Sequence, residues 1–210
     1  MRSNPKFDNV FVLSTGRTGT MTFNYACRHI KNYTSSHESL CREYGQKRLD
    51  YPKYHIEIDN RLVWMLGRLE NTFGKEAFYV HMKRRPEDVA KSYLNRRLSK
   101  IGIMAAYHRG ILKRYDQVTM ESAMDLVKTV NTNIDLFLKD KPNKMVFHID
   151  NSAENLSTFF KLIGADVDLY AARAEMTKKR NVSKKRSWAK SLVQGVKMFL
   201  KYKILKRKHN

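Results

Sequence analysis

Short apolar runs alternate along the chain with longer amphipathic stretches. The apolar runs, each of a length that suits one buried strand, are NVFVLS (9–14), AFYVHM (77–82) and KMVFHI (144–149). The amphipathic stretches predict helices over residues 20–31, 60–73, 86–98, 121–139 and 153–163. Strands that alternate with helices indicate βαβ units, so we expect an α/β fold with a mainly parallel central sheet flanked by helices.

In such sheets, ligands bind beyond the carboxyl ends of the strands. The segment STGRTGT (14–20) follows the first predicted strand and precedes the first predicted helix. A glycine turn there exposes backbone N–H groups at the positive end of the helix, and threonine hydroxyls add further donors. The segment therefore predicts a phosphate-binding loop, although a tight turn without a ligand is the alternative.

This loop differs from the ATP-binding Walker A sequence. In a Walker A loop, G-x-x-x-x-G-K-[ST], the glycines are five positions apart and are followed by Lys and then Ser or Thr. Here the glycines are three positions apart, Thr20 stands in place of the lysine, and the cation Arg17 lies inside the turn. The phosphate cradle is kept, but the residues that hold the terminal phosphates and magnesium of an NTP are missing.

The segment KRRPEDVAKS (83–92) repeats this design after the second apolar run. Three cations end the run, and Pro86 then stands where a first helical residue is favoured. Arg84 at the strand end and Ser92 on the helix are placed to bind one more phosphate, the arginine through a charge-assisted hydrogen bond. A capped surface helix with a solvated basic start is the alternative.

Together, the two segments resemble the sulfotransferases that use 3′-phosphoadenosine 5′-phosphosulfate (PAPS). STGRTGT is similar to their 5′-phosphosulfate loop, in a variant with arginine instead of lysine. KRRPEDVAKS is similar to their 3′-phosphate motif, an arginine followed eight positions later by a serine, with Pro-x-Asp between. The likeness covers roughly residues 8 to 165, and it implies a three-layer, P-loop-like α/β fold.

The resemblance also implies roles for individual residues. Arg17 would stabilise the charge of the departing phosphate, and a basic loop within KKRNVSKKRSW (178–188) would close over the nucleotide. No metal is expected. The residues that would bind PAPS are Gly16, Arg17, Thr18, Gly19, Thr20, Met21, Arg84, Ser92, Asn181, Lys184 and Lys185.

A base must take the proton of the acceptor, and YTSSHESL (33–40) is the best place to look. It is expected to form a short second strand that ends at the same rim, with His37 and Glu38 at its end. These two residues point to opposite faces of an extended chain, so we expect one to face the sulfate, with His37 ahead of Glu38. A plain surface role for His37 is the alternative.

Other polar residues near the predicted rim have two readings. Glu57, Asp59 and Asn60 precede the helix predicted at 60–73, where they would line an acceptor pocket or cap the helix. His81 and His148 lie within predicted strands and are expected to be packed rather than catalytic.

The charge of the chain is unevenly distributed. The net charge is +21, and residues 170–210 hold 14 of the 41 Lys and Arg but only one of the 20 acids. This excess favours an anionic partner. Residues 187–208 predict a basic amphipathic helix that packs on the domain, contacts anionic lipid, or attracts an acidic glycan or lipid-linked acceptor. We therefore divide the chain into a domain at 1–186 and a tail at 187–210.

Several classes of protein are disfavoured. No apolar run approaches the roughly 20 residues of a membrane span, and the start MRSNPKFDN has no apolar core of a signal peptide. Only Cys27 and Cys41 are present, too few for a disulfide framework, so a cytoplasmic protein is expected, with possible contact to the inner membrane surface.

Three functions agree with these patterns. The first is a PAPS-dependent sulfotransferase acting on a hydroxyl, with a carbohydrate or lipid-linked acceptor and no nucleic acid partner. The second is a P-loop nucleotide kinase or NTPase. The third is a basic polyanion- or membrane-binding protein with a degenerate nucleotide site.

Overall fold

The structure, a computed structural model, describes residues 4–95 and 102–178 of the chain. It contains a five-stranded, wholly parallel sheet in the order β2-β3-β1-β4-β5. The predicted α/β class is confirmed. The strands are β1 (Asn9–Ser14), β2 (Thr34–His37), β3 (His55–Ile58), β4 (Phe78–Lys83) and β5 (Lys144–His148).

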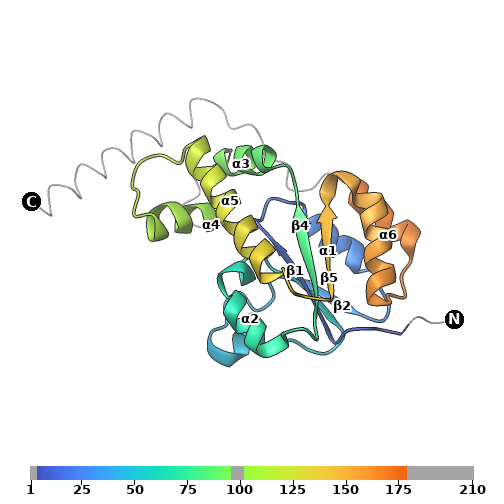
Figure 1. Cartoon of the computed structure of the whole chain (residues 1–210). Helices are drawn as coiled ribbons and strands as arrows, with labels where there is room; N and C mark the ends of the chain where they lie inside the picture. Colours follow the sequence, from blue (N-terminus) through green and yellow to red (C-terminus); the bar gives the residue numbers. More distant parts are fainter. Residues whose placement is uncertain (1–3, 96–101, 179–210) are drawn as a thin grey trace, which may run out of the picture.

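Helices cover both faces of the sheet, which gives three layers (Figure 1). The helices are α1 (Thr20–Cys27), α2 (Leu66–Phe73), α3 (Pro86–Leu94), α4 (Ile103–Ala105), α5 (Met120–Phe137), α6 (Ser152–Ile163) and α7 (Leu169–Thr177). Short 3₁₀ turns span Gly45–Leu49, Leu62–Trp64 and Ile149–Asn151, and a π-helical segment spans Ala106–Ile111.

Strand alternation divides the apolar residues between two cores. Phe11 and Leu13 of β1 face α2, α3 and α5, while Val10 and Val12 face α1, α6 and α7. All four side chains are fully buried. Because both faces of β1 are covered, its sequence is continuously apolar, as is typical of a central parallel strand.

Two elements differ from the sequence-based expectation. β3 lies in a stretch that was expected only to precede a helix, and the helix predicted at 60–73 is instead a 3₁₀ turn followed by α2. His148 is exposed rather than packed, because β5 forms one edge of the sheet and its end is uncovered. The proposed tail at 187–210 lies outside the described residues.

The path of the chain changes direction between β1 and β4. From β1 it passes through α1 on one face to β2, whereas from β4 it passes through α3 and α5 on the other face to β5. Adjacent strands whose connections leave in opposite directions form a crevice at their carboxyl ends, where ligands bind. Both segments predicted to bind phosphate begin at this crevice.

His81 of β4 is buried and ties the sheet to α5, as expected for a packed histidine. Its Nδ1 lies 3.0 Å from Oδ1 of Asp135, and its Nε2 lies 3.1 Å from Oδ1 of Asn131. Burial lowers the pKa of His81 from its usual 6.5, and the nearby Lys83 ammonium lowers it further.

The lowered pKa of His81 makes folding stability sensitive to acid. Below about pH 6.5 the unfolded chain binds a proton at this position more readily than the folded chain, so the free energy of unfolding should fall as the pH drops. His81→Gln should flatten this dependence in urea unfolding curves recorded between about pH 5.5 and 7.5. His148→Gln, at an exposed position, should leave the slope unchanged; equal slopes in all three proteins would contradict the prediction.

Candidate functional site

The loop after β1 has an unusual backbone that its glycines make possible. Gly16, Arg17 and Gly19 have φ angles of 73°, 62° and 89°, so three of four consecutive residues are in the left-handed region. Such angles favour glycine, and a non-glycine residue such as Arg17 needs support from its surroundings. The loop therefore folds back on itself before α1 begins at Thr20.

Neighbouring elements enclose the loop tightly. A Cβ atom on Gly16 would lie 2.9 Å from both Asn60 Nδ2 and the Tyr93 hydroxyl, and one on Gly19 would lie 2.9 Å from Ile149 Cδ1. The residues that follow β3 and β5, and helix α3, thus contact the loop. No larger side chain fits at either glycine without a shift of these neighbours.

The loop presents one buried hydroxyl without a partner. Thr18 is 1% exposed, and its Oγ1 is buried with no hydrogen-bond partner among the described residues. Gly19 provides no side-chain cap for α1, whose first turn contains no acidic residue. An orphan hydroxyl beside an uncapped positive helix end fits an anion such as a phosphate group.

The second predicted phosphate segment meets this loop directly. Arg17 Nε donates to Ser92 Oγ at 2.9 Å, and Arg84 Nη1 donates to the backbone carbonyl of Arg17 at 3.2 Å. The structure therefore brings Arg17, Arg84 and Ser92 together at one crevice. The Tyr93 hydroxyl adds a further tie by donating to the Thr15 carbonyl.

Tyr93 was not among the site residues that the sequence predicted. Its side chain is 7% exposed, but its hydroxyl reaches the loop, and burial raises the pKa of this phenol well above its usual value. Arg17 and Arg61 partly oppose this shift. Tyr93 directly follows Ser92, and that adjacency was the available signal for a role beside the site.

The two candidate bases have different partners. His37 Nε2 lies 3.0 Å from Thr20 Oγ1, at the start of α1. Glu38 has a φ of 54° and forms an ion pair with Arg61, which follows β3. His37 thus faces the start of α1, next to the loop after β1, whereas Glu38 pairs with a cation. The role of either residue as a base stays a prediction.

The acids of the β3 segment are buried rather than open to a pocket. Glu57 and Asp59 are both fully buried. Asp59 pairs with the guanidinium of Arg48 and accepts the backbone N–H of Arg61 at 2.7 Å. Burial raises the pKa of Asp59, and the Arg61 N–H and Arg48 offset part of this shift. The pocket-lining reading is therefore wrong for these two acids, while Asn60 does contact the loop.

The remaining predicted nucleotide contacts lie outside the described residues. They are Asn181, Lys184 and Lys185, within the basic segment from residue 179 onward. Within the described ranges, no group of three or more His, Cys, Asp or Glu side chains is placed to hold a metal ion, and no helix is both long and apolar enough to cross a membrane.

Comparison with solved structures identifies the fold as that of sulfotransferases. Mouse sulfotransferase SULT7A1, in a structure described as complexed with PAP, superposes with a TM-score of 0.54 at 15% identity, over 82% of this chain. The chain spans 66% of that protein, just under two thirds. The sulfotransferase domain from the curacin biosynthetic pathway gives 0.57 at 11% identity, over 87% of this chain and 81% of its own. No family model and no curated protein sequence matches.

The buried pair of Arg48 and Asp59 should matter strongly for stability. Arg48→Met leaves the Asp59 carboxylate without its buried partner, which should cost about 3–5 kcal/mol in the free energy of unfolding. Replacing both residues, Arg48→Met with Asp59→Leu, should recover most of this loss. Urea unfolding measures all three proteins.

An exposed pair provides the matched control. Lys53 and Asp8 lie 2.9 Å apart at the surface, so Lys53→Met should cost no more than about 1 kcal/mol. If the Arg48→Met and Lys53→Met proteins had equal free energies of unfolding, the buried pair would not contribute to stability as expected.

Proposed function

We propose that this protein is a sulfotransferase that takes a sulfuryl group from PAPS and transfers it to a hydroxyl acceptor. The observation that carries the proposal is the direct contact between the two segments predicted to bind phosphate, where Arg84 Nη1 lies 3.2 Å from the Arg17 carbonyl. An adenosine with phosphate groups at both its 3′ and 5′ ends needs two phosphate-binding segments close enough for one nucleotide to reach both. The similarity to a sulfotransferase complexed with PAP adds support.

The proposed contacts divide between the two ends of the nucleotide. The loop would hold the 5′-phosphosulfate through Gly16, the orphan hydroxyl of Thr18, Gly19, Thr20 and the backbone of Met21. Arg84 and Ser92 would hold the 3′-phosphate. Arg17, which contacts Ser92 in this structure, would move its guanidinium toward the phosphate that departs. Asn181, Lys184 and Lys185 would cover the nucleotide.

The chain would act mainly by positioning groups and stabilising charge. When bound, PAPS supplies the activated sulfuryl group. His37 would accept the proton of the acceptor hydroxyl at Nε2 as the new S–O bond forms, and Arg17 would stabilise the phosphate oxygen released from sulfur. Glu38 is the weaker candidate for the base, because its carboxylate already pairs with Arg61.

A nucleotide kinase is the main alternative, and the residues present support it less well. The acid that follows β3, Asp59, has its carboxylate occupied by Arg48 and by the N–H of Arg61. Thr20 also stands where a Walker A loop has its lysine. The acceptor is proposed to be a hydroxyl of a carbohydrate or lipid-linked sugar. An acidic glycan or an anionic lipid-linked sugar would be attracted by the positive charge of residues 170–210.

PAP, the desulfated product, should stabilise the folded protein without magnesium. At about 100 times its dissociation constant, a ligand adds about 2.7 kcal/mol, or about 5–10 °C in Tm for a chain of this length. Arg84→Ala removes a charge-assisted hydrogen bond and should weaken PAP binding by at least about tenfold. Differential scanning fluorimetry with EDTA present measures both effects.

Arg85→Ala is the matched control, since Arg85 is exposed and pairs with Asp88 in the first turn of α3, which begins one residue later. It should keep the full PAP response. A protein whose Tm ignores PAP but rises with Mg-ATP would be a nucleotide kinase instead, and one that responds to neither would favour the polyanion-binding alternative.

Removing the proposed base should separate catalysis from nucleotide binding. His37→Ala should lower sulfate transfer from labelled PAPS into a cell extract by about 10²–10⁴-fold, the typical contribution of general base catalysis. The PAP-induced rise in Tm should be retained. Glu38→Gln should lower transfer less; the reverse order of the two variants would make Glu38 the base.

A further inference from the structure

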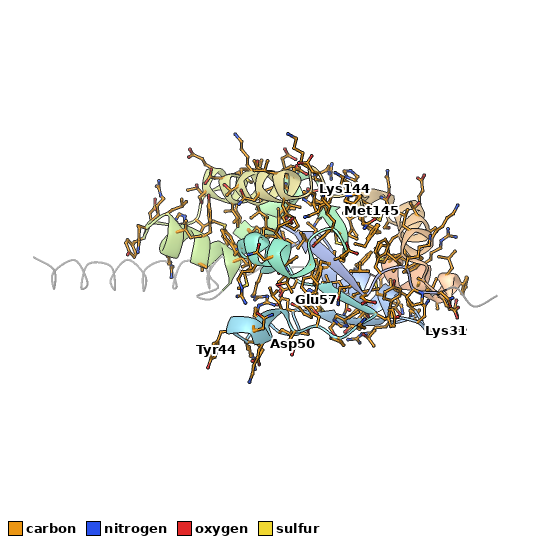
Figure 2. All side chains as sticks on the ribbon, turned by 60° about the horizontal axis from the view of Figure 1, so that its bottom comes forward. Lys31, Tyr44, Asp50, Glu57, Lys144 and Met145 are labelled. Atoms are coloured by element: carbon orange, nitrogen blue, oxygen red, sulfur yellow. The ribbon has the colours of Figure 1, made fainter. Side chains whose placement is uncertain are left out.

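A buried carboxylate lies directly beneath the turn that carries both candidate bases. Glu57 of β3 is fully buried, and its Oε1 accepts the Ser39 backbone N–H at 2.8 Å while its Oε2 accepts the Ser39 hydroxyl at 2.6 Å. His55 Nε2 lies 3.1 Å from the same Oε2. In Figure 2, Tyr44 projects outward from the segment after β2, whereas Glu57 lies inside among packed side chains.

Burial of a carboxylate is costly unless its oxygens are hydrogen-bonded. A partner within its own strand, His55, meets only part of this need. The other two bonds go to a single residue, Ser39, which lies 18 positions away in the sequence. Glu57 therefore holds both the backbone and the side chain of Ser39 in place.

The turn itself needs such a restraint. Glu38, between His37 and Ser39, has a φ of 54°, which costs a non-glycine residue roughly 1–3 kcal/mol unless its surroundings hold it. Its N–H bonds the Ile58 carbonyl at 3.1 Å, so the residue is held from β3 before the turn and by Glu57 after it. The left-handed conformation follows from these two anchors.

The conformation decides where each candidate base points. Continued extension of β2 would carry Glu38 along the strand, whereas the left-handed turn lets its carboxylate meet Arg61. His37, the last residue of β2, is left facing Thr20 of the phosphate loop. The same turn thus directs Glu38 away from the loop and leaves His37 facing it.

We propose that Glu57 is a positioning residue that fixes the turn after β2, so that His37 faces the phosphate loop and Glu38 pairs with Arg61. The expected effect on sulfate transfer rests on the proposed function. The expected positions of His37 and Glu38 do not depend on it. Glu57 acts through Ser39, without contact to the substrate. The simpler reading, in which Glu57 only satisfies His55, predicts no effect on His37.

The test compares Glu57→Gln with wild type by three measurements. In protein labelled with ¹³C,¹⁵N-histidine, the ring signal of His37, assigned by its loss in His37→Gln, should shift at fixed pH, while the signals of His81 and His108 should stay. The PAP-induced rise in Tm should match wild type. Sulfate transfer should fall by about 10–100-fold, since a misplaced group of about 1 Å can cost 10²-fold.

Two further variants complete the design. Ser39→Ala removes only the hydroxyl and should shift the His37 signal in the same direction by a smaller amount; it also decides the matter if Glu57→Gln fails to fold. Glu76→Gln makes the same substitution at an exposed acid and should change none of the three measurements.

The outcomes separate the inference from the proposed function. An unchanged His37 signal in folded Glu57→Gln, or in Ser39→Ala where it must stand in, would overturn the positioning role. Loss of the PAP response in Glu57→Gln would overturn it as well, by showing general damage to the domain. A wild-type protein that ignores PAP would instead defeat the proposed function, while the His37 signal would still test the position of the turn.

Discussion

The left-handed loop between β1 and α1 is the constraint on which the site depends. It forms because glycines occupy two positions where any side chain would collide with Asn60, Tyr93 or Ile149. Asn60 follows β3, Tyr93 lies on α3 and Ile149 follows β5, so the loop is held by the surrounding fold rather than by its own hydrogen bonds alone. The sheet places those elements, and the loop in turn places Arg17 against Ser92.

The elements around the two segments predicted to bind phosphate could be predicted from sequence, because the pattern that defines each of them is local. A strand, a glycine turn and a helix start follow one another within residues 9 to 27, and the basic segment after β4 repeats the arrangement. Parallel strands bring their carboxyl ends to one rim, so the pairing of the two segments could be expected from sequence. The hydrogen bond between Arg17 and Ser92 could not be predicted from sequence, because side-chain torsions depend on the packed neighbours.

β3 was missed for the opposite reason. Its sequence HIEI carries a histidine and a glutamate at alternate positions, a pattern that suggests one wet face. All four residues are buried, because Thr34 of β2 and Ser39 of the turn after β2 supply hydrogen-bond partners for His55 and Glu57. The sequence near residues 55–58 gives no indication of these partners. The exposed His148 shows the same limit, since its surroundings depend on which strand lies at the edge.

The open edge of the sheet at β5 carries its own protection against self-association. Among the described residues no strand pairs with its outer side, and such an edge is a template for adding strands from other copies. Lys144 begins this strand, and its ammonium donates to the carbonyls of Leu138 and Lys139 beyond the end of α5. A charge that discourages intermolecular pairing is therefore also a helix cap. Replacing Lys144 would therefore remove a charge from this open edge and a cap from α5 at the same time.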